Sequence, residues 1–225
     1  MTPIEQLLSS FEPIKVISTE IDYSDYIALD LSENNKELQN HKLETAQDYE
    51  KFIQNYLDKN NAKIAFGGYI ETRNLYKRSS VFKDNNSDER NIHIGLDLWI
   101  NEQAKIYAAL DGTIHSFQNN TALGDYGPTL ILQHKIDGFT FHTLYGHLSL
   151  ESLSDKKIGD KIKKGEQIAT LGLPPINGDY APHLHFQIII DMENKTGDYP
   201  GVCSEKTLDF YTNNCPNPNI LLKIN

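Results

Sequence analysis

From about residue 66 the sequence is a series of short apolar segments separated by turn residues, and this pattern constrains the fold most. The segments TLILQH, GFTFHTLYGHL, EQIATLG and HLHFQIII are rich in the β-branched and aromatic residues that strands favour. Asp137-Gly138 separates two such segments and is a strong signal for a hairpin turn. Because no long helical pattern interrupts the region, the sequence predicts a mainly β fold, a twisted antiparallel sheet or sandwich.

The first part of the chain has a different pattern, which predicts two domains: a helical N-terminal extension over 1–65, packed on the core, and the β domain over 66–225. Thr2 followed by proline is typical of a helix start. Thr45 followed by Asp48 predicts the cap of a second helix. A stripe of apolar side chains then recurs at helical spacing, at Ala46, Tyr49, Phe52, Ile53, Tyr56 and Leu57. We expect this stripe to pack on the main domain, and a partner-binding face is the alternative.

Charge and composition exclude several classes of partner. The formal net charge is −10, from 31 acidic and 21 basic residues, which disfavours nucleic acid and anionic membranes. No stretch approaches the ~20 apolar residues of a membrane span, and the N-terminus has no positively charged leader. We therefore expect a cytoplasmic protein, or a periplasmic or cell-envelope protein if a leader has been removed. Cys203 and Cys215 are expected to be reduced thiols.

The triplet His183-Leu184-His185 indicates a chemical site. Pro182 disfavours helix at the residue before it, so an extended strand is expected to follow. Residues two apart in a strand point to the same face, which places both histidines side by side. Two buried structural histidines are the alternative, and it is uncommon because buried imidazoles need partners. The triplet therefore favours a metal or catalytic role.

A second motif contains His93 and Asp97, four residues apart with Gly95 between them. The glycine favours an irregular strand or bulge that brings both donors to one point. Alone this is a weak signal, and a hydrogen-bonded surface pair is the alternative. With the two histidines of the triplet, however, the motif offers the three or more donors that a catalytic zinc needs. His147 supplies a further imidazole from a position between the two motifs.

These motifs resemble the signatures of the lysostaphin/LytM-type zinc metallopeptidases, a family of peptidoglycan endopeptidases. The matching segments are 93–97, 144–149 and 182–186, in the same order and at similar separations. Segments 108–114 and 159–168 are similar to strands of that family, which implies the duplicated-hybrid fold with lipoyl-like barrel halves. FGGYIETRNLY and the GDYPGV…CPNPNILL tail are similar to the LytM-like domain that accompanies class III aminotransferases.

The resemblance also implies roles for five residues. His93, Asp97 and His185 would be the zinc ligands, and His147 and His183 the catalytic histidines that do not bind the metal. The implied reaction is hydrolysis of a peptide bond, in a short peptide or a peptidoglycan fragment, by metal-activated water. One alternative is a LytM-like module that binds metal without catalysis and has a regulatory or binding role. Another is phosphoryl transfer by a histidine pair, which Asp97 disfavours because a carboxylate suits a cation better than a phosphohistidine.

Overall fold

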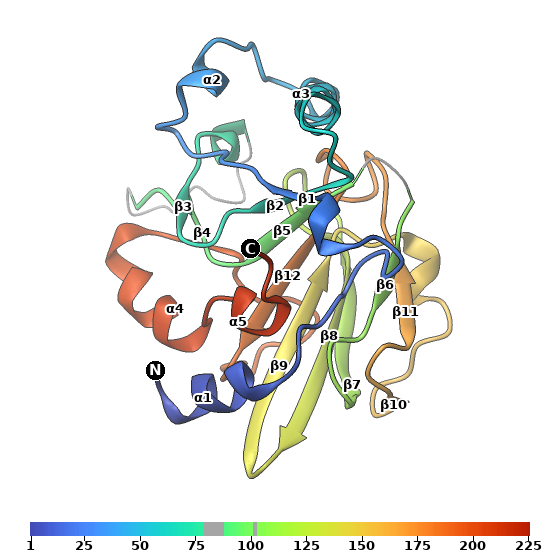
Figure 1. Cartoon of the computed structure of the whole chain (residues 1–225). Coiled ribbons are helices and arrows are strands. Elements are labelled where there is room, and N and C mark those ends of the chain that lie inside the picture. The colour runs from blue at the N-terminus through green and yellow to red at the C-terminus, as the bar shows by residue number, and fades with distance from the viewer. Residues whose placement is uncertain (79–87, 101–102) are drawn as a thin grey trace.

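The computed structural model describes residues 1–78, 88–100 and 103–225. The sequence also predicts a charged loop over 80–91, before the first motif, and most of this segment lies outside the described residues. In the described chain, eight strands form one open sheet with β1 and β10 at its edges (Figure 1). In spatial order the strands are β1 (Tyr26–Ala28), β2 (Ile64–Gly67), β5 (Leu96–Trp99), β12 (His183–Ile189), β9 (Phe139–Gly146), β8 (Gly127–Ile136), β7 (Gly112–Asn120) and β10 (Lys161–Ile162). The mainly β, antiparallel fold predicted from the sequence is confirmed.

One strand pair departs from the antiparallel expectation. β1 and β2 run parallel, with Tyr26 opposite Ile64, whereas every other neighbouring pair of the sheet is antiparallel. Parallel neighbours need a crossover connection, and helix α3 (Ala46–Lys59) and the short helix α2 (Lys36–Gln39) lie in the chain between them. The extension, expected to be helical, thus also contributes an edge strand.

The hairpin of β8 and β9 has the predicted turn. Ile136 pairs with Phe139, and the two residues between them, Asp137 and Gly138, have φ of 48° and 82°. Two positive φ angles are what a two-residue type I′ turn requires, and Asp-Gly is among its preferred sequences. The long yellow arrows in Figure 1 show this hairpin within the sheet.

Two small sheets complete the β structure. β11 (Gln167–Thr170) pairs with β6 (Lys105–Tyr107), and β4 (Ile92–His93) lies between β13 (Val202–Cys203) and β3 (Glu71–Thr72). The two segments that resemble lipoyl-type halves lie side by side, because β7 pairs with β10 and β6 with β11. Short helices α4 (Leu208–Asn214) and α5 (Asn219–Leu222) end the chain, and 3-10 turns span Tyr23–Asp25, Leu75–Arg78, Leu150–Leu153 and Glu205–Thr207.

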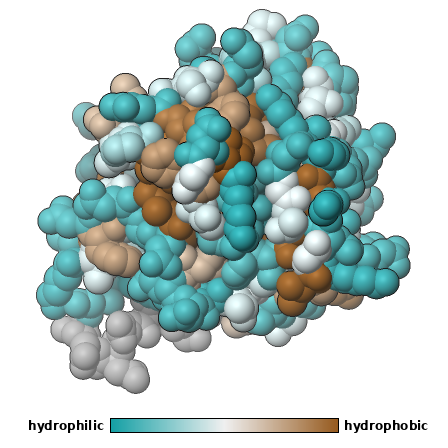
Figure 2. All heavy atoms as spheres, turned by 90° about the horizontal axis from the view of Figure 1, so that it is seen from below, coloured by the Kyte–Doolittle hydropathy of each residue, from teal (hydrophilic) through white to brown (hydrophobic). Residues whose placement is uncertain are grey.

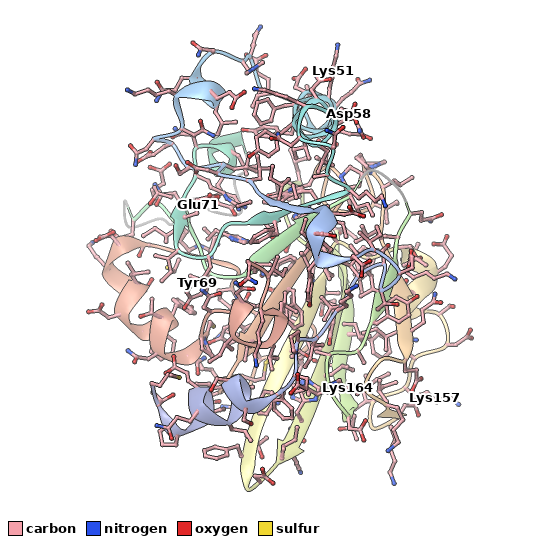
Figure 3. All side chains as sticks on the ribbon, in the orientation of Figure 1. Lys51, Asp58, Tyr69, Glu71, Lys157 and Lys164 are labelled. Atoms are coloured by element: carbon pink, nitrogen blue, oxygen red, sulfur yellow. The ribbon has the colours of Figure 1, made fainter. Side chains whose placement is uncertain are left out.

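The helices of the extension begin where the sequence predicts. Helix α1 (Pro3–Ser10) is capped by Thr2, and α3 follows Thr45, whose hydroxyl accepts from the Asp48 amide at 3.2 Å. Figure 3 shows Lys51 and Asp58 on α3 at the upper side of the molecule, above the sheets, and both side chains are exposed. None of the described helices combines the length and the apolar character needed to cross a membrane.

The buried side chains form three clusters around the sheets. The largest contains Leu184, Phe186 and Ile188 of β12, all fully buried as expected for one face of this strand. A second cluster joins Phe52, Ile53 and Leu57 of the α3 stripe to neighbours that include Leu29, Leu31, Ala65, Trp99 and Ala181.

The lower side of the molecule, seen in Figure 2, is largely hydrophilic around a hydrophobic area. The division at residue 65 stays a prediction, and β2 spans it.

Candidate metal centre

Three donor side chains meet where β12 passes beside β5 and close to β4. Asp97 of β5 is directly opposite His185 of β12, and His93 ends β4. Nε2 of His93 lies 2.9 Å from Nδ1 of His185, and Oδ1 of Asp97 lies 3.3 Å and 3.2 Å from these two nitrogens. All three residues are at most 2% exposed. Their ligand atoms lie within 4.8 Å of one another, a spacing that suits one metal ion.

Hydrogen bonds orient His93 and His185 through the ring nitrogens that point away from the other donors. Nδ1 of His93 donates to the carbonyl of Gly68 at 2.9 Å, and Nε2 of His185 donates to Oε1 of Gln187 at 2.9 Å. The remaining nitrogen of each ring therefore carries a lone pair, and these lone pairs face each other beside the Asp97 carboxylate. Histidine ligands of metals are held in this way by carbonyls and amides. A donor set with inward-facing lone pairs fits a cation such as Zn²⁺.

The protonation states of the set suit a metal as well. Burial lowers the pKa of His93 to about 4, and the nearby Arg73 cation adds to this effect. Burial opposes ionisation of Asp97, but the electrostatic effect of the His93 ring and of the Arg73 cation lowers its pKa well below the ordinary value. The imidazole of His93 is therefore neutral and the carboxylate ionised near pH 7, which are the forms that bind a metal.

His147 and His183 form a second pair beside the donor set. Their rings lie 4.2 Å apart, and Nε2 of His183 is 3.8 Å from Oδ1 of Asp97. Nδ1 of His147 donates to the carbonyl of Asn177 at 2.8 Å, and Nδ1 of His183 donates to that of Ala181 at 2.7 Å. Burial lowers the pKa of both rings. Each Nε2 is therefore an unprotonated nitrogen that can accept a proton.

All five residues line one cavity of about 130 Å³. This is well above the roughly 10–15 Å³ that a single water molecule needs, so the cavity has room for several. Other side chains of the wall come from distant parts of the chain: Leu31, Ala46, Tyr49 and Ile53 from the N-terminal extension, and Arg90, Asp125, Tyr126, Tyr180 and Asp198 from the β domain. The extension thus forms part of the wall around the histidines.

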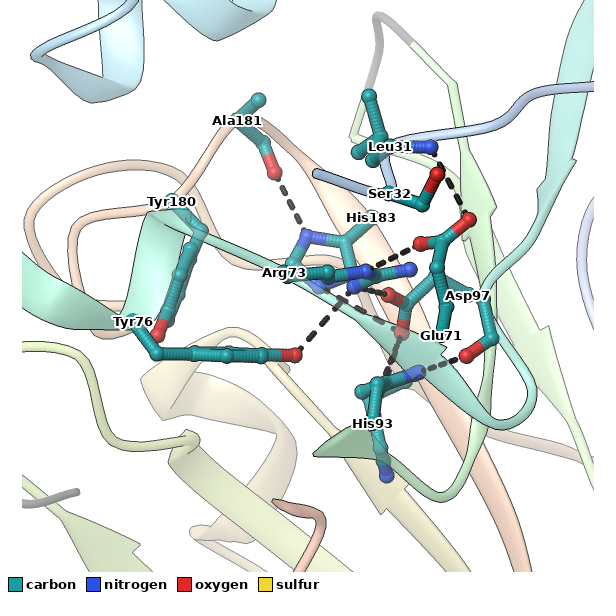
Figure 4. Close-up of polar contacts among 12 residues, drawn as sticks. Leu31, Ser32, Glu71, Arg73, Tyr76, His93, Asp97, Tyr180, Ala181 and His183 are labelled. Carbon is teal, nitrogen blue, oxygen red and sulfur yellow. Dashed lines mark hydrogen bonds and ion pairs between the residues drawn. The ribbon is translucent and has the colours of Figure 1, made fainter. Parts of the chain in front are cut away.

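The structure adds one site residue that no sequence motif indicated. Arg73 is 2% exposed, and its Nη1 donates to Oδ2 of Asp97 at 2.6 Å (Figure 4). In the sequence it is a single basic residue in a polar segment, which is typical of a solvated side chain. Its burial depends on the packing of segments far apart in the chain, so no local pattern could have indicated it.

Comparison with known proteins places these residues in a family. Residues 91–197, which include all five, match the model of Peptidase family M23. The chain is similar to the catalytic domain of the antimicrobial peptidase lysostaphin from Staphylococcus simulans, with 24% identity, 68% of this chain and 94% of that chain covered, and a TM-score of 0.40.

A second similar structure is a catalytic-domain mutant of the prophage-encoded M23 protein EnpA from Enterococcus faecalis, with 20% identity, 53% of this chain and 87% of that chain covered, and a TM-score of 0.38. No curated protein matches the chain. Segment 91–197 of the chain is therefore similar to peptidase family M23.

Proposed function

We propose that this protein is a zinc-dependent endopeptidase or amidase that hydrolyses a peptide bond in a short peptide or a peptidoglycan fragment. His93, Asp97 and His185 are the proposed ligands. The observation that carries the proposal is the inward orientation of their donor atoms, with a Gly68 carbonyl and the Gln187 amide behind the two rings. A bound zinc supplies a water of lowered pKa and polarises the substrate carbonyl.

His147 and His183 are the proposed catalytic histidines. Both rings are anchored at Nδ1 by backbone carbonyls, so each Nε2 has a fixed direction. One ring takes a proton from the attacking water, and a ring in its protonated form gives a proton to the leaving amine. Positioned acid and base groups of this kind contribute roughly 10²–10⁴-fold in rate.

The alternative is a LytM-like module that binds metal without catalysis. One observation favours it: none of the five residues is more than 6% exposed, and the extension forms part of the cavity wall. A long polymer would need more access than this. We include in the proposal the division into an extension (1–65) and a peptidase domain (66–225).

Metal analysis and substrate screening together test the proposal. Purified protein is expected to contain one divalent metal per chain, and His93→Ala and His185→Ala are expected to lose it. Muropeptides and short peptides, glycine-rich ones included, are then incubated with the protein and analysed by mass spectrometry. Cleavage that disappears in His147→Ala, while the metal is retained, supports the enzyme. Stoichiometric metal without cleavage of any substrate supports the alternative, and absence of metal contradicts both.

A further inference from the structure

The two carboxylate oxygens of Asp97 have different surroundings. Oδ1 faces the imidazoles, at 3.3 Å from His93, 3.2 Å from His185 and 3.8 Å from His183. Oδ2 faces away from them and accepts from Nη1 of Arg73 at 2.6 Å. The side chains of Asp97 and Arg73 are 1% and 3% exposed, so water does not compete for this ion pair.

The guanidinium of Arg73 is held on several sides. Nε donates to Oε2 of Glu71 at 2.5 Å, and Nη1 also reaches the hydroxyl of Tyr76 at 3.4 Å. The cation lies 5.6 Å from the centre of the Trp99 ring. Nη2 is buried, has no hydrogen-bond partner among the described residues, and packs where a side chain on Gly68 would lie. These contacts hold the Arg73 guanidinium in one position, in which Nη1 donates to Oδ2 of Asp97.

The charge of this arginine is offset locally. A lone cation beside a metal site would repel the metal, but Glu71 pairs with Nε of Arg73, whereas Asp97 pairs with Nη1 (Figure 4). The Arg73–Glu71 pair is neutral, so the donor set keeps the single negative charge of Asp97. Glu71 is fixed in turn, because its Oε1 accepts from the backbone amide of Leu31 at 3.0 Å. Figure 3 shows Glu71 below α2 and above α4.

We propose that Arg73 is a positioning residue that restricts Asp97 to ligation through one oxygen, and that Glu71 is the counterion that makes this compatible with a bound cation. The inference rests on the proposed metal site. A carboxylate free to bind through both oxygens would fill an additional coordination position. Catalytic zinc sites have three protein ligands and keep a position for water. Arg73 thus preserves the open position through its hold on Asp97.

Cobalt(II) in the full-length protein is the probe, because its visible absorption weakens as its coordination number rises above four. The variant Arg73→Met combined with Glu71→Gln removes both charges of the pair, and the bound cobalt remains as the cation beside the Asp97 carboxylate. We expect this variant to bind cobalt with clearly weaker visible bands than the wild type, at unchanged secondary structure by circular dichroism. Bands identical to those of the wild type would overturn the positioning role.

Cobalt binding by the single variant Glu71→Gln is the second measurement, and it remains informative even if the double variant does not fold. It leaves Arg73 on Asp97 but removes the counterion, so the cobalt spectrum is expected to stay unchanged while the affinity falls roughly 10–100-fold, as for other residues behind metal ligands. Unchanged affinity overturns the counterion role. Failure of the wild type to bind cobalt or zinc would instead contradict the proposed function, so the two failures are distinguishable.

Discussion

Replacing Gly95 by alanine tests the geometry of the metal centre with a single methyl group. A Cβ at this position would lie 2.3 Å from Cε1 and 2.5 Å from Nε2 of His185, whereas ordinary contacts begin at 3.4 Å. The φ of Gly95 is outside the left-handed region, so the backbone tolerates alanine and the steric contact is the only direct effect. The imidazole must therefore move by about 1.1 Å, the difference between 2.3 and 3.4 Å.

This displacement is large for a metal ligand. Metal–ligand distances hold within roughly 0.2 Å, so His185 would no longer reach an ion bound by His93 and Asp97. The ring cannot adjust freely, because Tyr126 lies against it with ring centres 5.0 Å apart. We expect zinc affinity to fall by about 100-fold or more, which corresponds to roughly 2.7 kcal/mol. The metal-free protein should lose only about 1–3 kcal/mol of stability, as for other overpacked sites.

Zinc titration in competition with a chromophoric chelator measures the loss, and a double-mutant cycle identifies its cause. If Gly95→Ala acts through His185, adding it to His185→Ala should weaken binding no further. Thermal unfolding of the metal-free variants controls for folding. Wild-type zinc affinity in Gly95→Ala would refute the reasoning, and so would full additivity of the two substitutions.

Three further predictions concern stability. Burial lowers the pKa of His134 to about 4, so between pH 6.5 and 4 the unfolded state takes up a proton that the folded state refuses. Lowering the pH from 7 to 5 should therefore reduce the free energy of unfolding by about 2 kcal/mol through this group. In urea unfolding, His134→Asn should show a correspondingly smaller decrease. Thr45→Ala removes the hydroxyl that accepts from the Asp48 amide and should cost about 1 kcal/mol in thermal unfolding, with Thr45→Ser as the control. Removing metal with a chelator should lower the unfolding temperature and zinc should restore it, with about 2.7 kcal/mol gained at 100 times the dissociation constant; a metal effect that persists in His93→Ala would contradict the assigned ligands.

The strand that carries two of the site histidines was predictable because its signals are local. Pro182 marks its start, and the alternation of Leu184, Phe186 and Ile188 determines which face packs into the largest hydrophobic cluster. The period of two then places His183 and His185 on the other face. The hairpin at Asp137-Gly138 was predictable for the same reason, since the turn conformation depends on those two residues alone.

Other features depend on partners far away in the sequence. Strand β1 has only three residues and exists because Ile64 and its neighbours offer a sheet edge, so its own residues carry little signal. Arg73 is 24 residues from Asp97 and is buried by packing between segments that no periodicity relates. The local pattern therefore specified the donors of the candidate site but not the groups that hold those donors in place.

The hydrogen bond from His93 to the carbonyl of Gly68 limits how short a segment can carry the intact metal centre. The family segment begins at residue 91, yet the groups that fix His93 and Asp97 from behind, Gly68 and Arg73, lie before it. A transplanted or truncated segment that started at residue 91 would bring every donor but lose the restraints on two of them. The smallest unit that can be moved intact must therefore reach back at least to β2, whose Gly67 pairs with Asp97.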